Sequence, residues 1–106
     1  MYKKIWIVPL IEIHKQAQID LVAACEWYEE QQVGLSKRFR SEVQFKLQLI
    51  AVNPELYPKK YNNYLHFAPV RKFPYVIVYW YEEKLDTVFV TSIFHTKRNP
   101  GKFERK

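Results

Sequence analysis

The chain has 106 residues, of which 48% are apolar and only two are glycine. This composition argues against a disordered chain, so we expect one domain over residues 1–106, with a basic tail from about residue 96. Lysine and arginine outnumber the acidic residues by 17 to 11, which gives a net charge of +6. Such an excess favours an anionic partner, namely nucleic acid, a ribosome or an acidic protein.

The chain has one cysteine, Cys25, which cannot form an internal disulfide, so a reducing compartment is favoured. The first residues, MYKKIWIVPLIEIH, have a basic start and an apolar run. However, Pro9, Glu12 and His14 interrupt that run and no small-residue cleavage site follows, which argues against a signal peptide. No apolar run is long enough to cross a bilayer. We therefore expect a cytoplasmic protein without membrane contact.

Apolar periodicity predicts one strand and two helices in the first half of the chain. The second helix should end at Asn53-Pro54, because a residue before proline is pushed out of the α region. The predicted elements are a strand at Ile11–Ile13, with a possible extension back to Ile5, and helices at Gln16–Gln32 and from Leu35 to about Val52.

The second predicted helix carries two apolar stripes instead of one. They consist of Phe39, Val43, Leu47 and Ile50, and of Phe45, Leu49 and Val52. One stripe should cover a sheet, so the other needs the first helix, a second copy of the chain or a partner peptide as its cover. The first helix is the simplest cover, since consecutive helices usually pack as a hairpin.

Three strand patterns follow a polar loop, at Tyr64–Lys72, Pro74–Tyr81 and Thr87–Phe94. Pro69 favours an edge position or a bulge for the first of them. Strict alternation in the last strand separates Val88, Val90 and Phe94 from Phe89, Thr91 and Ile93. The element order is then β-α-α-β-β-β, which predicts an α+β fold with a helical hairpin packed on a mainly antiparallel, twisted sheet.

Four segments in this order carry a family resemblance. GLSKRF opens the second helix, NPELYP follows it, RKFPYVIVYWY lies in the last hairpin and FHTKRNP closes the pattern. Together they resemble the RelE/ParE toxin superfamily, most closely its ParE-like branch, over about Ile11 to Pro100. The resemblance implies the toxin of a type II toxin–antitoxin pair, which works without a cofactor and is neutralised by a small cognate antitoxin.

Two targets are implied by that resemblance. ParE-like members poison DNA gyrase by binding to it, whereas RelE-like members cut mRNA on the ribosome without a metal. The ParE-like activity is the favoured interpretation, because His95 is followed by Thr96 where RNA-cutting members carry an aromatic residue or a denser set of catalytic side chains. The chain could also form a homodimer or a hetero-oligomer with its antitoxin.

A basic patch is expected where two of the predicted strands end. The strands that end near Arg71 and His95 both pair antiparallel with the middle strand, so their ends should meet at one edge of the sheet. The patch for a target or a phosphate would comprise Arg71, Lys72, Lys97 and Arg98. In a nuclease, Arg71 would hold the phosphate and His95 would act as acid or base; in the favoured interpretation His95 and Arg98 have structural or docking roles.

The remaining candidate residues concern antitoxin binding, metal binding and surface charge. We expect the antitoxin to contact the second stripe of the helix and two tyrosines of the sheet, that is Phe45, Leu49, Val52, Tyr79 and Tyr81. His14 and His66 lack ligand spacing, so no metal site is predicted. Glu42 and Glu55 are candidate partners for His95. Four further cations could extend the basic surface, but solvated charge is the expected state of each, namely Arg38, Arg40, Lys59 and Lys60.

Overall fold

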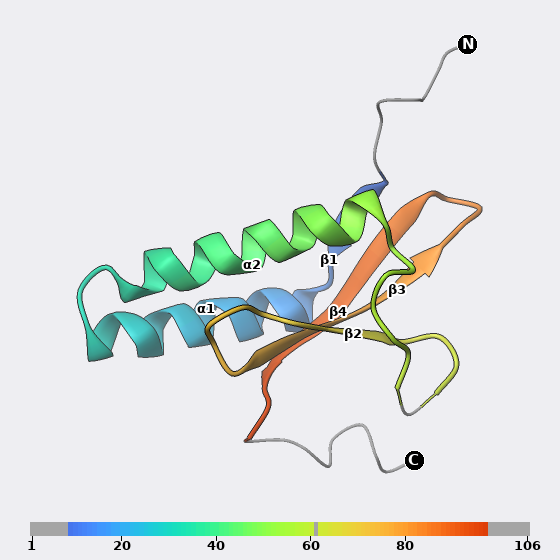
Figure 1. Ribbon diagram of the computed structural model, residues 1–106. Coiled ribbons are helices and arrows are strands. Elements are labelled where there is room, and N and C mark those ends of the chain that lie inside the picture. Colours follow the sequence, from blue (N-terminus) through green and yellow to red (C-terminus); the bar gives the residue numbers. More distant parts are fainter. Residues whose placement is uncertain (1–8, 61, 98–106) are drawn as a thin grey trace.

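The computed structural model describes residues 9–60 and 62–97 (Figure 1). The elements in chain order are β1 (Leu10–Ile13), α1 (Lys15–Gln31), α2 (Leu35–Val52), β2 (His66–Pro69), β3 (Tyr75–Glu82) and β4 (Thr87–His95). The predicted α+β fold and its β-α-α-β-β-β order are confirmed. The proposed extension of the first strand to Ile5 and the tail from residue 98 onward lie outside the described residues.

The four described strands form one sheet in the order β1-β4-β3-β2. β3 pairs antiparallel with β2 and with β4, whereas β1 pairs parallel with β4. The sheet is therefore mainly antiparallel, as predicted. β2 lies at its edge, which is where Pro69 is tolerated because a proline has no N–H to donate to a neighbouring strand.

The two helices form a hairpin that packs on one face of the sheet (Figure 1). The hairpin turns at Gly34, whose φ of 90° is a left-handed conformation that glycine adopts without strain. Asn53 is the C-cap of α2, because its N–H still bonds to the carbonyl of Leu49. The core beneath the hairpin contains Phe39, Val43 and Ile50 from α2, Ala17, Ala24, Cys25 and Tyr28 from α1, and Ile77, Tyr79, Val88, Val90 and Ile93 from the sheet.

The alternation predicted for the last strand is wrong because β4 contains a bulge. The register jumps from Val78 opposite Ser92 to Tyr79 opposite Val90, so Thr91 is an extra residue. Such a bulge reverses the faces of the residues that follow it. Val88, Val90 and Ile93 consequently share the helix-covered face, and Phe94 lies with Phe67 on the opposite face, their ring centroids 6.4 Å apart.

A side chain of α1 stabilises the bulge from outside the sheet. β1 ends at Ile13, opposite Val90, so none of the described strands lies beside the next part of β4 on that edge. There the Asp20 carboxylate accepts a hydrogen bond of 2.9 Å from the N–H of Ile93. The helix thus replaces the missing strand at the point where the sheet changes register.

The first helix does not cover the second apolar stripe of α2. Phe45 is 42% exposed and Val52 is 72% exposed, and Leu49 is partly exposed. The other stripe is buried as expected, with Phe39, Val43 and Ile50 in the core. The simplest cover predicted for the second stripe is therefore wrong for the described chain.

Candidate functional site

The turn between β2 and β3 is built by the RKFPY segment. The N–H of Val70 donates to the carbonyl of Tyr75, and the N–H of Tyr75 donates to the carbonyl of Phe73, both at 2.8 Å. The Phe73 ring packs edge-on against Tyr28 and Phe39 of the two helices, at centroid distances of 5.0 and 5.1 Å. The turn is therefore fixed against the helical hairpin, and it holds the exposed Arg71 and Lys72 in place.

Arg71 points to α2. Its Nε lies 3.4 Å from one carboxylate oxygen of Glu42, and its Nη2 donates to the other oxygen at 3.4 Å. The guanidinium also lies 5.3 Å from the centre of the Phe45 ring, in cation–π geometry. The charge that a nuclease would need to hold phosphate is thus already engaged by a carboxylate.

His95 lies at the end of β4, opposite Tyr75. Its ring packs edge-on against the Tyr75 ring at 5.2 Å, and its Nδ1 accepts a hydrogen bond of 3.1 Å from the N–H of Lys97. The next residue, Thr96, donates its N–H to the carbonyl of Pro74. These contacts tie the end of β4 to the start of β3.

The predicted patch is thus found in part. Pro69 pairs with Val76 and His95 with Tyr75, so the ends of β2 and β4 do meet beside the start of β3. The side chains of Arg71 and Lys72, however, lie against α2. Arg98 lies outside the described residues. Glu42 has Arg71 as its partner, and Glu55 lies near His66.

A small hollow opens between the first half of α2 and the β2–β3 turn. It has a volume of about 280 Å³ and is lined by Lys37, Arg38, Ser41, Glu42, Lys72 and Phe73. Arg38 is exposed, as expected for a solvated charge, and it lines the same hollow as Lys72. The sequence did not show which residues it would join there, since Arg38 and Lys72 lie in different elements and no local spacing connects them.

The antitoxin candidates divide into exposed and buried side chains. Phe45 and Val52 are exposed on α2, as a contact surface requires. Tyr79 is fully buried, and burial raises the pKa of its hydroxyl far above the ordinary value, so it does not belong to an exposed surface of this chain. Tyr81 is partly exposed, and its hydroxyl donates to Asp86 at 2.7 Å, a bond that raises the pKa of Tyr81 to about 12.

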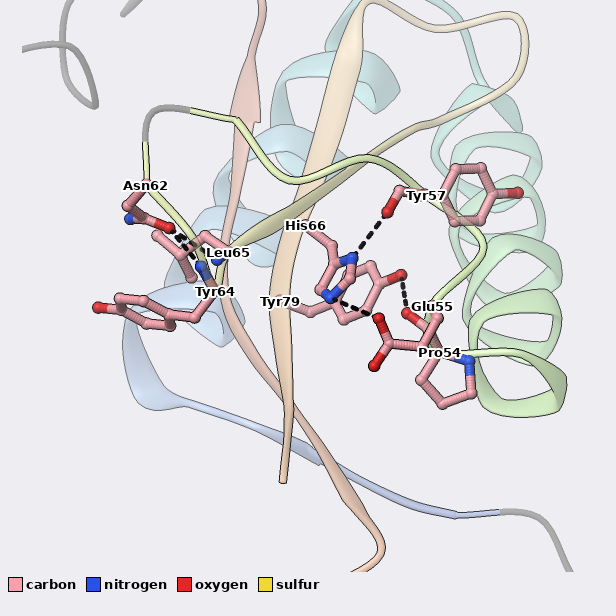
Figure 2. Close-up of polar contacts among 8 residues, drawn as sticks. All are labelled: Pro54, Glu55, Tyr57, Asn62, Tyr64, Leu65, His66 and Tyr79. Atoms are coloured by element: carbon pink, nitrogen blue, oxygen red, sulfur yellow. Dashed lines mark hydrogen bonds and ion pairs between the residues drawn. The ribbon is translucent and has the colours of Figure 1, made fainter. Parts of the chain in front are cut away.

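His66 is the buried titratable side chain that sequence reasoning left without a role. Its Nδ1 lies 2.7 Å from the carbonyl of Tyr57, so that nitrogen carries the proton, and its Nε2 lies 3.8 Å from the exposed Glu55 carboxylate (Figure 2). The ring stacks on Tyr79 at 4.9 Å, and the Tyr79 hydroxyl donates to the carbonyl of Pro54. These contacts fasten the segment after α2 to the sheet. We call the residues that make them the loop clamp, namely Pro54, Glu55, Tyr57, His66 and Tyr79.

α1 also carries an exposed apolar side that the sequence-based list of contact residues omitted. Ile19 and Val22 are about half exposed and line a hollow of about 400 Å³ together with Ala23. Their spacing of three and four residues was visible in the sequence, but it was overshadowed by the buried set on the opposite side of the helix. Both helices therefore present apolar side chains to the outside.

Within residues 9–60 and 62–97, no three His, Cys, Asp or Glu side chains come together as metal ligands would. Neither of the two described helices is long and apolar enough to span a bilayer.

The fold is that of the RelE/ParE toxins. The RelBE toxin–antitoxin complex of E. coli contains a chain with 16% identity and a TM-score of 0.66, covering 85% of this chain and 99% of that one. A chain of the chromosomal ParDE system of P. aeruginosa has 9% sequence identity and a TM-score of 0.71, and the match covers 83% of this chain and 96% of that one. A chain of the RelBE2 complex of Mycobacterium tuberculosis has 14% sequence identity and a TM-score of 0.59, and the match covers 84% of this chain and 99% of that one.

The sequence itself matches the family described as the ParE toxin of the type II toxin–antitoxin system parDE, over residues 11–100. This match spans most of the chain, so the protein belongs to the ParE toxin family. It is thus the toxin component of a type II toxin–antitoxin system. No curated protein is similar enough in sequence to match.

Proposed function

We propose that this chain is a ParE-like toxin that inhibits DNA gyrase by binding to it, and that a cognate antitoxin keeps it silent in the cytoplasm. The family match over residues 11–100 supports the ParE-like branch. The structural observation that carries the proposal is the engagement of Arg71 by Glu42 and Phe45. A cation held in this way suits a docking surface better than it suits phosphate stabilisation during RNA cleavage.

The antitoxin contact in this proposal is the exposed stripe of α2, formed by Phe45, Leu49 and Val52. An exposed row of apolar side chains on a helix matches an amphipathic partner segment, whose own apolar side chains would be buried against it. Leu56, which is 54% exposed just beyond the helix, extends the same apolar character into the loop. The structures of the E. coli and P. aeruginosa relatives come from toxin–antitoxin systems, which supports a protein partner of this kind.

The target is tested by measuring which synthesis stops first after the chain is induced in bacteria. Incorporation of labelled thymidine and of labelled methionine is followed in the same culture. A gyrase inhibitor should lower DNA synthesis first and leave protein synthesis running. Early loss of methionine incorporation with continued DNA synthesis would overturn the gyrase target.

A second candidate is ribosome-dependent, metal-free mRNA cleavage. The observation that favours it is the meeting of the β2 and β4 ends at one edge of the sheet, where the N–H of Lys97 donates to His95. It predicts codon-phased cuts in a translated mRNA that disappear in the His95→Gln variant. Primer extension on mRNA from a reconstituted translation reaction measures this, and uncut mRNA would rule the candidate out.

A further inference from the structure

We infer that the hollow between α2 and the β2–β3 turn is a binding site for the phosphodiester backbone of a nucleic acid, with Lys37, Arg38 and Lys72 as its cations. This inference goes beyond the proposed inhibition of gyrase, and it holds whichever protein is the target. The site differs from the sheet edge that carries His95, because Lys37 and Arg38 come from the start of α2.

The charge of the hollow favours an anion. Its lining contains three cations and one carboxylate, Glu42. That carboxylate is paired with a fourth cation, Arg71, so it does not cancel the charge of the other three. The first turn of α2 contains no acidic residue of its own. The Glu29 carboxylate lies at the N-terminus of α2, where it accepts from Gly34 and Ser36, and it does not line the hollow.

The site is also preorganised. The turn that carries Lys72 is closed by two backbone hydrogen bonds within residues 70–75, and the Phe73 ring packs against Phe39 of α2. Lys72 has a φ of 70°, a left-handed conformation that costs a non-glycine residue on the order of 1 kcal/mol. The turn therefore holds a cation at a position where asparagine or glycine would fit with less strain.

The size and composition of the hollow favour a repeating anion over a small enclosed ligand. At about 280 Å³ it lies below the usual range for sites that enclose a drug-sized molecule. Three cations spread over two elements instead suit successive phosphates along a strand. The net charge of +6 favours the same partner, since a polyanion is attracted by the whole chain as well as by the site.

The test is fluorescence anisotropy of the purified chain with a labelled DNA duplex and with a labelled single-stranded RNA, over a range of salt concentrations. Three phosphate contacts predict a slope of log affinity against log salt of about −2.7 on the duplex and about −2.1 on the single strand. Whichever nucleic acid binds more tightly identifies the source of the phosphodiester.

The variants are Arg38→Gln and Lys72→Asn, with Lys84→Gln as the matched control. Lys84 is an exposed lysine in the β3–β4 turn, at the opposite end of β3. Each site variant should weaken binding roughly threefold to tenfold and make the duplex slope less steep by about 0.9, whereas the control should change neither. Lys72→Asn should also keep or raise the melting temperature, because asparagine tolerates the left-handed conformation, so weaker binding could not be attributed to unfolding.

Several results would overturn the inference. One is the absence of nucleic-acid binding at low salt, and another is an equal loss in the Lys84→Gln control. A third is tighter binding of polyaspartate than of either nucleic acid at the same charge concentration, which would instead identify the hollow as a docking site for an acidic protein.

Discussion

Asp20 connects α1 to the part of β4 that follows the bulge. In the fold its two carboxylate oxygens accept from Gln16 and from the N–H of Ile93, both at 2.9 Å. Nothing in the local sequence connects residue 20 with residue 93, so only the tertiary fold could reveal this bond.

We predict that Asp20→Ala destabilises the chain by about 1–3 kcal/mol, because the partly buried N–H of Ile93 loses its acceptor. Urea unfolding followed by circular dichroism measures the change. Glu26→Ala, an exposed position on the same helix, serves as the control and should cost much less. Equal losses in the two variants would mean that Asp20 has no special part in holding the bulge.

Glu29 caps the second helix from the end of the first. Its carboxylate accepts from the N–H of Gly34 and from both the N–H and the hydroxyl of Ser36. These bonds lower the pKa of Glu29 below the ordinary value of 4.5, the bond from Gly34 being the largest cause. The ionised form is therefore favoured in the folded state, and its contribution to stability is present above pH 4.5 and is lost as the pH falls below that value.

It follows that Glu29→Gln should lower the melting temperature at neutral pH and have little effect in acid, where the native carboxyl is itself protonated. Thermal unfolding at several pH values measures the difference between the two proteins. Glu30→Gln removes the same charge from the neighbouring exposed position and is the control. A difference between Glu29→Gln and the native protein that does not shrink in acid would contradict the capping role.

At the scale of elements, the helices and most strands could be predicted, whereas the faces of β4 could not. Gly34 and Asn53-Pro54 are local signals, and they place the boundaries of α2 within its own sequence. The bulge at Thr91 has no comparable signal, because Val90, Thr91, Ser92 and Ile93 read as an ordinary strand. β2 is also shorter than predicted, since the Asn62 side chain accepts from the N–H groups of Tyr64 and Leu65 and holds that segment in a turn.

The loop clamp determines how firmly the segment after α2 is held. We predict that Tyr79→Phe costs about 1 kcal/mol, because the carbonyl of Pro54 loses its donor while the ring stack with His66 remains. Amide hydrogen exchange should become faster in residues 54–60 and stay unchanged in α1. Tyr64→Phe, at an exposed tyrosine, is the control, and unchanged exchange in the Tyr79→Phe variant would show that the clamp does not hold this segment.

A substitution in the exposed stripe of α2 should change the affinity for the antitoxin without changing the stability of the fold. Val52→Lys should weaken binding of the cognate antitoxin by about tenfold or more, since a fully buried valine contributes roughly 1.5–3 kcal/mol. Titration calorimetry with the product of the neighbouring short reading frame measures this. Val33→Lys, at an exposed valine in the helical hairpin turn, is the matched control, and equal affinities of the two variants would remove α2 from the interface.

For the whole molecule, the sequence was sufficient for the family and the fold but not for the arrangement of charge. The topology brings the ends of β2 and β4 together as predicted, yet the side chains of the β2–β3 turn face α2. The partner of Arg71, Glu42, is 29 positions away in the sequence, and no local pattern around Glu42 predicts that it pairs with Arg71. The fold therefore decides which charges are paired and which stay exposed.

The most direct test of the central claim is a supercoiling assay with purified gyrase, relaxed plasmid and this chain. The account predicts that supercoiling falls as the chain is added, and that prior addition of the cognate antitoxin restores it. Full gyrase activity at an excess of a folded chain that still stops bacterial growth would contradict the proposed target.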